Sequence, residues 1–377
     1  MRESPLPPTF PGGRVPVVTV IMPVRNEFGA IRTSLLSILA QDYPKSALEI
    51  LVVDGDSDDG TPDIVRELVA EHPQVRWVNN PGRIVATALN LGIQSARGEI
   101  IARMDAHTEY ALDYVTQCVA LLLQTEADNV GGPWVARGTT RFTRAVAAAF
   151  QSPIGSGGAR AHNPSYEGWV DTVYLGCWRK DLFQRVGGFA EDMIRNQDDE
   201  HNLRLIRVGS RIWQSPRVRS WYQPRECLGE LSRQYCQYGY WKIRIMQKHR
   251  RPASFRHVVP AVCLLVGLSL AIVSPWFPAA RSALLALLGA HLTLVVLGSV
   301  LVASRAGWDL VPLLPVVFYC FHLSYGYGSI RGVLDFVVLR RGAQPRFGRL
   351  TRGRRWAEQG AKWRDQVPEH QGDSRPA

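Results

Sequence analysis

The chain has 377 residues, enough for two domains, and its 44 Lys/Arg against 33 Asp/Glu give a formal net charge of +11. The surplus is uneven: residues 1–230 are slightly acidic, and the basic residues gather in 231–257 and 331–377. These two segments flank an apolar region, which argues against a nucleic-acid-binding domain and favours anionic membrane lipids as partners. The six cysteines show neither a C-x-x-C pair nor zinc-ligand spacing.

Strand and helix signals alternate through the first part of the chain. Residues 1–15 are a Pro/Gly-rich leader, expected to be flexible and lacking the apolar core of a secretory signal. Apolar strand segments are predicted at residues 17–24, 48–54, 75–80 and 99–105, and helices at about 30–41, after Thr61 and at 84–96. This order predicts an α/β domain over residues 16–230, with a mainly parallel central sheet and helices on both faces.

Four aspartates follow the strand at 48–54 in the stretch "DGDSDDG". A calcium loop starting at Asp54 would need Gly at its sixth position and Glu at its twelfth, but Asp59 and Val65 stand there. Asp54 itself lies at the carboxyl end of a predicted parallel strand, where open α/β sheets bind ligands. We therefore predict a ligand site at Asp54, with a plain turn as the alternative. The later aspartates are expected to be turn and cap residues, before a helix with Thr61 as N-cap and Pro62 at its first position.

The pattern changes at residue 257. Two charge-free apolar stretches, 258–274 and 282–303, are long enough or nearly so to span a bilayer, and a third at 310–328 is interrupted by two prolines. Residues 257–330 are therefore predicted to form a membrane region of two to three apolar helices. Because basic segments on both sides favour the cytoplasm, we expect an even number of crossings: a hairpin, with 310–328 at the interface or re-entering.

Basic segments border this membrane region on both sides. Residues 231–256 are predicted to form a basic amphipathic juxtamembrane helix whose Lys and Arg side chains face lipid phosphates. Residues 331–377 form a basic tail.

Four polar constellations fall at predicted strand or helix ends: "MPVRNE", "VVDGDS", "RMDAHT" and "NQDDEHNLRL". In this order and spacing the chain resembles the family-2 glycosyltransferases with a GT-A fold. Among them it is most similar to the membrane-attached type that builds succinoglycan-like exopolysaccharides. The resemblance covers residues 16–245 in detail and implies a nucleotide-sugar donor. It also implies that the turn from Pro23 through Arg25 to Glu27 wraps the nucleoside.

Three further residues are assigned to the nucleotide by the same resemblance. Asp54 would accept a hydrogen bond from the base or ribose, and Arg83 and Asn90 would face the nucleotide. A surface arginine and a locally packed helix asparagine are the alternatives for the last two.

The family's D-x-D metal motif appears here as Asp105-Ala106-His107. A diphosphate leaving group needs a divalent cation, and a carboxylate with an imidazole suits Mn²⁺ or Mg²⁺, the imidazole favouring Mn²⁺. Polypeptide N-acetylgalactosaminyltransferases also use a D-x-H form, so Asp105 and His107 are predicted metal ligands, with Asp105 also at the nucleotide sugar. Alternatively, His107 hydrogen-bonds a phosphate.

The family's catalytic base maps to Asp198, with Gln197 in place of the usual Glu and with Asp199 and Glu200 as runners-up. A charged helix N-terminus is the alternative reading of these acids. On the acceptor side, the resemblance implies Gly176 and Trp178 as pocket walls, with ordinary packing as the alternative. The stretch "QYGYW" matches a Q-x-x-R-W motif only at Gln237 and Trp241, so those two residues could contact the acceptor.

Together these features predict an inverting, metal-dependent glycosyltransferase on the cytoplasmic face of a bacterial inner membrane. It would transfer a sugar, with UDP-glucose the expected donor, to a saccharide on polyprenyl diphosphate. The alternatives are a processive polysaccharide synthase, a polyprenyl-phosphate glycosyltransferase and a non-catalytic membrane scaffold.

Overall fold

Continuous apolar strands form the centre of the first domain. The computed structural model describes residues 13–250 and 254–349. Its main sheet has eight strands in the order β3-β2-β1-β4-β9-β6-β10-β8. Their bounds are β1 Val18–Val24, β2 Leu48–Asp54, β3 Val75–Asn79, β4 Ile100–Arg103, β6 Asn129–Gly132, β8 Gly168–Val170, β9 Tyr174–Arg179 and β10 Ile212–Gln214. Strands β3, β2, β1 and β4 pair in parallel, as do β6 and β10, while β9 and β8 run antiparallel to their neighbours. The predicted mainly parallel sheet is thus confirmed.

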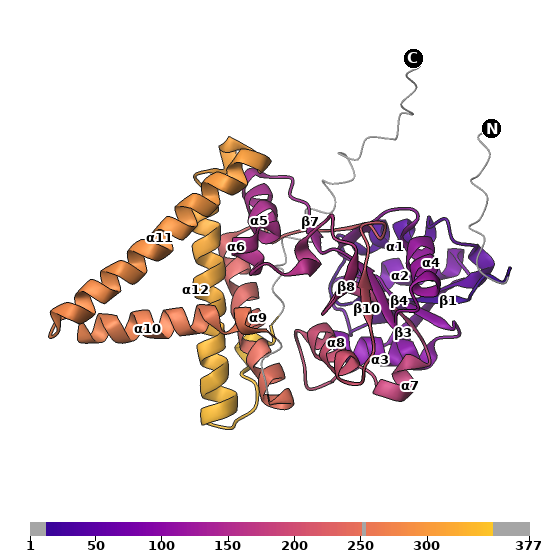
Figure 1. The fold of residues 1–377 in the computed structure, drawn as a ribbon. Coiled ribbons are helices and arrows are strands. Elements are labelled where there is room, and N and C mark those ends of the chain that lie inside the picture. The colour runs from indigo at the N-terminus through magenta and orange to yellow at the C-terminus, as the bar shows by residue number, and fades with distance from the viewer. Residues whose placement is uncertain (1–12, 251–253, 350–377) are drawn as a thin grey trace, which may run out of the picture.

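Two layers of helices cover this sheet because alternate strand residues point to opposite faces. One face packs on helices α1 (Ile31–Leu39), α2 (Thr61–Glu71) and α4 (Tyr114–Gln124). The other packs on α3 (Val85–Ser95), α7 (Leu182–Val186) and α8 (Gln197–Arg207). A smaller sheet, in the order β5-β11-β7, holds β5 Thr108–Tyr110, β7 Val135–Ala136 and β11 Ser220–Tyr222. The α/β layers lie on the right of Figure 1.

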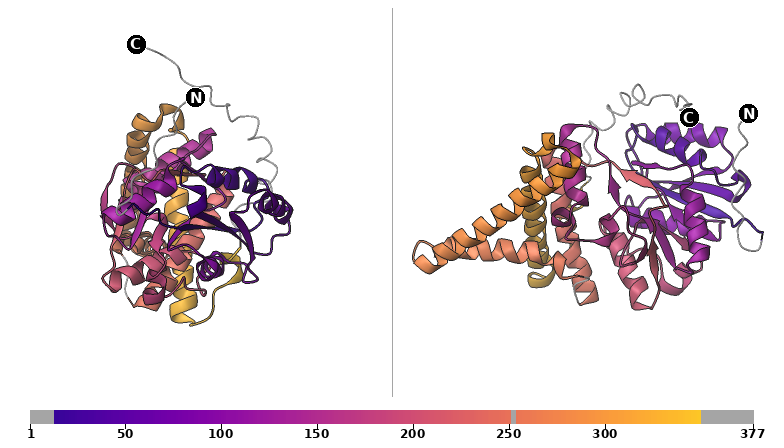
Figure 2. Two further views of the ribbon diagram at one scale, coloured as in Figure 1. Left: turned by 90° about the vertical axis from the view of Figure 1, so that its right-hand side faces the viewer. Right: turned by 45° about the horizontal axis from the view of Figure 1, so that its top comes forward.

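A helical region follows the α/β domain. It contains α9 (Leu228–His249), α10 (Val259–Val273), α11 (Pro278–Ala306) and α12 (Leu314–Gly332), with a 3₁₀ turn at Phe255–His257. Helices α5 (Arg141–Gln151) and α6 (Pro153–Ser156), from within the first domain, lie beside them (Figure 1). Two helices of the described chain are long and apolar enough to cross a membrane, Phe255–Val273 and Pro278–Ala306. They project as a hairpin whose large apolar side chains are mostly exposed (Figures 1 and 2).

Helix α12 does not share this exposure. It contains most of the stretch predicted at 310–328, from Leu314 on, and it packs along α9 with a shared apolar core that also includes α5 and α11. Beyond it, Val333–Val338 forms a π-helical turn and the chain returns to α9 through Phe336 and Phe347. Residues 331–349, predicted as the start of a basic tail, are therefore part of the packed structure; residues 350–377 and 1–12 lie outside the described residues.

Glycines bring α9 and α12 unusually close. A Cβ atom added at Gly239 of α9 would lie 2.1 Å from the carbonyl oxygen of Tyr325, and one at Gly328 of α12 would lie 2.0 Å from that of Cys236. Real Cβ atoms do not approach backbone oxygens so closely. The central Gly of "QYGYW" is therefore required by the crossing of two helices.

Replacing Gly328 with Ala should therefore destabilise the protein by about 1–3 kcal/mol, the usual effect of overpacking. The matched control is Gly289→Ala in α11, where no atom lies within 4 Å of the added methyl group. That control should be neutral or slightly stabilising, since Ala is the better helix former. Thermal unfolding in detergent measures both. Equal melting temperatures for the two variants would contradict the close crossing.

Candidate active site

The acidic loop after β2 is held to the turn after β1 by hydrogen bonds. Asp54 is almost fully buried, and its carboxylate accepts from the hydroxyl of Ser57 at 2.6 Å and from the Ser57 amide at 3.2 Å. The Ser57 hydroxyl oxygen accepts in turn from the backbone N–H of Asn26 at 2.9 Å. Asn26 and Asp58 exchange two further hydrogen bonds, at 2.8 and 3.0 Å. The loop is therefore a rigid support for the carboxyl ends of β1 and β2.

The start of α2 differs by one position from the prediction. Thr61 is the first helical residue and Gly60, with φ of +84°, is the N-cap. Asp59 accepts from both the amide and the hydroxyl of Thr61, at 3.1 and 2.5 Å. The predicted role of Asp59 as a turn and cap residue is confirmed, because this carboxylate provides the acceptor that the glycine lacks.

Two predicted nucleotide contacts meet above this loop. Arg83, in the left-handed conformation with φ of +60°, pairs with Asp56. Arg25 donates from Nη1 to the carbonyl oxygen of Arg83 at 3.1 Å. The side chains of Arg25 and Arg83 are partly exposed and lie at the carboxyl ends of β1 and β2. Pro23, the second-last residue of β1, lies at the same edge.

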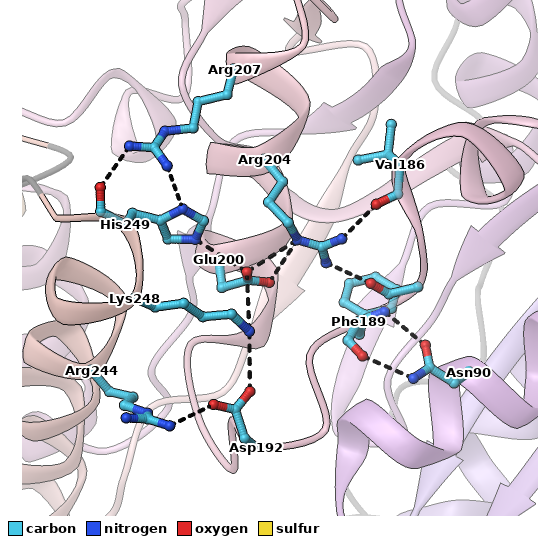
Figure 3. Close-up of polar contacts among 11 residues, drawn as sticks. Asn90, Val186, Phe189, Asp192, Glu200, Arg204, Arg207, Arg244, Lys248 and His249 are labelled. Atoms are coloured by element: carbon cyan, nitrogen blue, oxygen red, sulfur yellow. Dashed lines mark hydrogen bonds and ion pairs between the residues drawn. The ribbon is translucent and has the colours of Figure 1, made fainter.

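Asn90 has different partners from those expected. Its side-chain amide donates to the carbonyl oxygen of Phe189 at 2.9 Å and to Glu191 at 2.8 Å, while its oxygen accepts from the Phe189 amide at 2.7 Å. Figure 3 shows this clamp between α3 and the segment before α8. Asn90 thus fixes the loop that leads to Asp198, because both the nitrogen and the oxygen of its side-chain amide form hydrogen bonds with that loop.

A pocket of about 420 Å³ lies beside Asp54. Strand β3 contributes Trp77 and Asn79, and α2 contributes Pro62 and Arg66. The guanidinium of Arg66 lies 4.9 Å from the centre of the Trp77 ring. The tryptophan in the short strand "VRWVNN" was the available sequence signal for this pocket. In a sequence, however, a tryptophan that lines a pocket cannot be told from one that packs in the core.

The metal-motif residues follow β4. Asp105 receives a bidentate contact from Arg103, at 2.8 and 2.9 Å, and both side chains are about nine-tenths buried. His107 Nδ1 lies 3.2 Å from Oε1 of Glu27. Arg103 was not predicted, yet it links two candidates. Burial alone would lower the pKa of Arg103, but the carboxylates of Asp105 and Asp198 raise it, so both lie near the guanidinium.

The donor set fits a divalent cation only if the substrate completes it. No group of three or more His, Cys, Asp or Glu side chains in residues 13–250 and 254–349 could hold a metal ion. Asp105 and His107 are two ligands, and Mg²⁺-type sites commonly combine one or two protein ligands with phosphate oxygens and water. The neighbouring carboxylate of Glu27 provides the hydrogen-bond partner that metal-bound imidazoles usually have. The residues present therefore fit Mn²⁺ or Mg²⁺ bound together with a diphosphate.

Two adjacent carboxylates begin α8. Burial together with the charge of Asp199 raises the pKa of Asp198, although the charge of Arg103 acts to lower it. Burial also opposes ionisation of Asp199, but Lys242 of α9, at 2.6 Å, outweighs it and lowers the Asp199 pKa. Of the two, Asp198 is the stronger base and lies on the side of the metal motif.

Glu200, a predicted runner-up, is fully buried and has structural partners. Arg204 donates to its carboxylate at 3.1 Å, and His249 of α9 approaches it at 3.1 Å (Figure 3). Lys248 lies 3.5 Å from Glu200 and 3.2 Å from Asp192, which also pairs with Arg244 at 3.0 Å. Glu200 is therefore an anchor between α8 and α9, because its buried carboxylate is held by Arg204 from its own helix and by Lys248 and His249 from α9.

These contacts correct the prediction for residues 231–256. The basic side chains of the segment that pair in the structure do so with carboxylates of the α/β domain: Lys242 with Asp199, Lys248 with Asp192 and Glu200, Arg244 with Asp192, and Arg256 with Asp171. Helix α9 is a buried connector whose other side packs on α12. Lipid phosphates are not its partners at these positions, because the protein supplies the anions.

The predicted acceptor-side residues also lie elsewhere. Trp178 is buried in the core under α7 and α8, and a Cβ at Gly176 would meet the Trp178 ring at 2.4 Å. Trp241 is buried with Phe336 and Phe347, and its indole donates to the carbonyl oxygen of Phe347 at 2.9 Å. Gln237 joins Arg195 to the carbonyl oxygen of Arg349. Gly176, Trp178, Gln237 and Trp241 therefore all have internal contacts in the protein. Such ordinary packing was the alternative interpretation for Gly176 and Trp178.

An aromatic cluster that the sequence did not indicate borders the metal motif instead. Trp134 stacks on Tyr174 with 5.1 Å between centroids and 6° between planes. Tyr222 lies edge-on to Trp134 at 5.7 Å and to His107 at 6.4 Å. The hydroxyl groups of Tyr174 and Thr108 are 2.8 Å apart. These rings come from β9, β11 and the β6–β7 connection, so only the folded sheet brings them together.

Comparison with known proteins agrees with this arrangement. The family model described as "Glycosyl transferase family 2" matches residues 19–187. The succinoglycan biosynthesis protein ExoA of Rhizobium meliloti (strain 1021) is 30% identical over 329 residues, which cover 84% of this chain and 95% of that protein. A second relative, from Methanococcus voltae, is named dolichyl N-acetyl-alpha-D-glucosaminyl phosphate 3-beta-D-2,3-diacetamido-2,3-dideoxy-beta-D-glucuronosyltransferase. It is 24% identical over 84% of this chain and 97% of its own length.

Among solved structures, the mannosyltransferase PcManGT from Pyrobaculum calidifontis, in complex with GDP-Man and Mn²⁺, superposes with a TM-score of 0.55. It covers 85% of this chain and 88% of that one at 23% identity, so it bears on the fold. The family match, the identity to a full-length relative and the GT-A fold lead to one conclusion. The chain belongs to glycosyltransferase family 2 and is an enzyme of that family.

Proposed function

We propose that this enzyme transfers one sugar from a nucleotide donor to a lipid-linked saccharide, by a single displacement that inverts the anomeric centre. The observation that carries the proposal is that the buried Arg103 holds Asp105, two residues before His107, with two hydrogen bonds and that its charge also acts on the Asp198 carboxylate. A carboxylate base thereby lies next to a pair of side chains suited to a cation-bound diphosphate.

In this mechanism Asp198 takes the proton from the acceptor hydroxyl while that oxygen attacks the donor sugar. Its raised pKa makes it a stronger base than an exposed aspartate, and Lys242 keeps Asp199 ionised beside it. Arg103 holds the Asp105 carboxylate in place with two hydrogen bonds. Asp105 and His107 would hold a divalent cation, which when bound neutralises negative charge on the diphosphate.

The nucleoside is assigned to the carboxyl edge of β1 and β2, with Asp54, Arg25 and Arg83 as contacts. We propose UDP-glucose as the donor, as the resemblance to exopolysaccharide enzymes implies. GDP-mannose, the ligand named for PcManGT, is the first alternative to test.

The acceptor proposal draws on the relatives and on the apolar hairpin. One relative is named for succinoglycan biosynthesis and another for transfer to a dolichyl-linked sugar. A polyprenyl diphosphate saccharide would be held at the membrane by its lipid, and helices α10 and α11 would hold the enzyme at the same surface. We place the α/β domain in the cytoplasm of a bacterium, at the inner membrane.

The buried Trp241 argues against a processive synthase, because the tryptophan that would line a glucan entrance packs on Phe347 instead. A polyprenyl-phosphate glycosyltransferase would use bare lipid phosphate in preference to saccharide-loaded lipid, which an acceptor comparison distinguishes. The paired ionisable residues at the site argue against a non-catalytic scaffold.

The first prediction concerns donor turnover. Purified protein in detergent, given a panel of nucleotide sugars with Mn²⁺, Mg²⁺ or EDTA, should release nucleotide from one donor in a metal-dependent way. Asp198→Asn should lower kcat about 10²–10⁴-fold with little change in donor affinity, because it removes only the base. Asp105→Ala should weaken metal-dependent nucleotide binding as well. Nucleotide release by Asp198→Asn at the wild-type rate would exclude Asp198 as the base.

The second prediction concerns pH. Asp198 must be ionised to act, so kcat/KM should fall as the pH drops through its raised pKa. Asp199→Asn removes a neighbouring negative charge while Arg103 and Lys242 remain, so the Asp198 pKa should fall and the acid limb should move to lower pH. Asp192→Asn, which also loses contacts to α9 cations, is the matched control and should leave the limb in place. The same acid limb in wild type and Asp199→Asn would argue against this coupling.

The third prediction concerns the hairpin. Helix α11, with 29 residues, is about 43 Å long, more than the hydrocarbon core of a bilayer. If α10 and α11 cross, a sole cysteine introduced by Ser274→Cys should react with an impermeant maleimide from outside the cell. Native Cys227, exposed on the α/β domain, should as sole cysteine react only in inverted vesicles. Protection of residue 274 on both sides would show that the hairpin stays within one leaflet.

A further inference from the structure

The turn after β1 presents Glu27 to the metal motif in a fixed conformation. The Glu27 amide donates to the hydroxyl of Thr61 at 3.0 Å, and its carbonyl oxygen accepts from the amides of Ala30 and Ile31 at the start of α1. Asn26, directly before it, is in the left-handed region with φ of +55°. Backbone hydrogen bonds on both sides therefore set the direction in which the Glu27 side chain leaves the turn.

That side chain reaches His107 rather than solvent. Oε1 of Glu27 lies 3.2 Å from Nδ1 of His107, and the two side chains are 12% and 24% exposed. The ring of Tyr222 lies edge-on to the imidazole at 6.4 Å and 75°. An ionised carboxylate can only accept, so Nδ1 carries a hydrogen, and in the neutral imidazole the lone pair then lies on Nε2.

We propose that Glu27 is a positioning residue for the metal ligand His107: it fixes the tautomer and orientation in which Nε2 binds the divalent cation together with Asp105. The inference rests on the proposed metal-dependent function and deepens it. It gives Glu27 a role through His107, in place of the direct nucleoside contact implied by family resemblance.

The second carboxylate oxygen supports this role. Oε2 of Glu27 is buried and has no hydrogen-bond partner within residues 13–250 and 254–349. A buried carboxylate oxygen without a partner is unfavourable, so an acceptor remains for water or ligand atoms beside the imidazole. Partners of metal-bound histidines are commonly carboxylates, and losing one typically lowers metal affinity 10–100-fold.

The experiment measures Mn²⁺ binding by the electron paramagnetic resonance of free Mn²⁺, on full-length protein in detergent with saturating UDP. Glu27→Ala should raise the Mn²⁺ Kd about 10–100-fold. Glu27→Gln keeps an acceptor for Nδ1–H and should retain most of the affinity. In a His107→Ala background, Glu27→Ala should add nothing further, because its target is gone. Glu109→Gln is the matched control: Glu109 is also a carboxylate near the motif, but it pairs with Arg137 at 3.1 Å.

A calorimetric titration of UDP in EDTA separates the two roles of Glu27. Unchanged metal-free UDP binding by Glu27→Ala supports the positioning role. A loss of UDP binding without metal, equal to the loss with metal, would show a nucleoside contact and overturn the inference. Wild-type protein whose UDP affinity is no higher with Mn²⁺ than in EDTA would overturn the metal-dependent function itself, a result distinct from either.

Circular dichroism and thermal unfolding accompany each variant and show whether it is folded.

Discussion

The ion pairs between α8 and α9 are the interaction on which the rest of the structure depends. Asp199 and Glu200, on the first turn of α8, meet Lys242, Lys248 and His249 from one side of α9. Several of these groups are largely buried, and removing one member of a buried pair leaves the other charge without compensation. The helix that leads to the apolar hairpin is thus joined to the α/β domain by the turn that carries Asp198. The position of α9 and the position of this turn depend on the same few charges.

Much of the α/β domain could be predicted from the sequence. The strand at 48–54 has the predicted bounds, because its centre from residue 50 to 53 is an apolar run typical of a strand buried on both faces and the strand ends at its first aspartate. Asp54 and Asp105 follow parallel strands, whose carboxyl ends share one edge of the sheet, and both lie at that edge. The helices at 259–273 and 278–306 follow equally directly from the length of charge-free segments.

Partners distant in the sequence could not be predicted. A helix with Trp, Tyr and several basic residues has the composition of a membrane-surface helix, and nothing local shows that carboxylates 43 to 56 residues away meet its cations. Asn90 looks like a ligand-binding polar residue until its bonds to Phe189, 99 residues on, are known. Glu27 and His107 likewise lie 80 residues apart. In each case the residue type was informative, but its partner depended on the tertiary fold.

The glycine crossing of α9 and α12 has a consequence for how the apolar hairpin is carried. Two helices whose backbones touch cannot slide past one another, and α9 is also tied to α8 by the ion pair of Lys242 with Asp199. The distance from the apolar hairpin to the start of α8 is therefore set by the protein. The helix pair acts as a rigid spacer between the exposed apolar helices and the α/β domain.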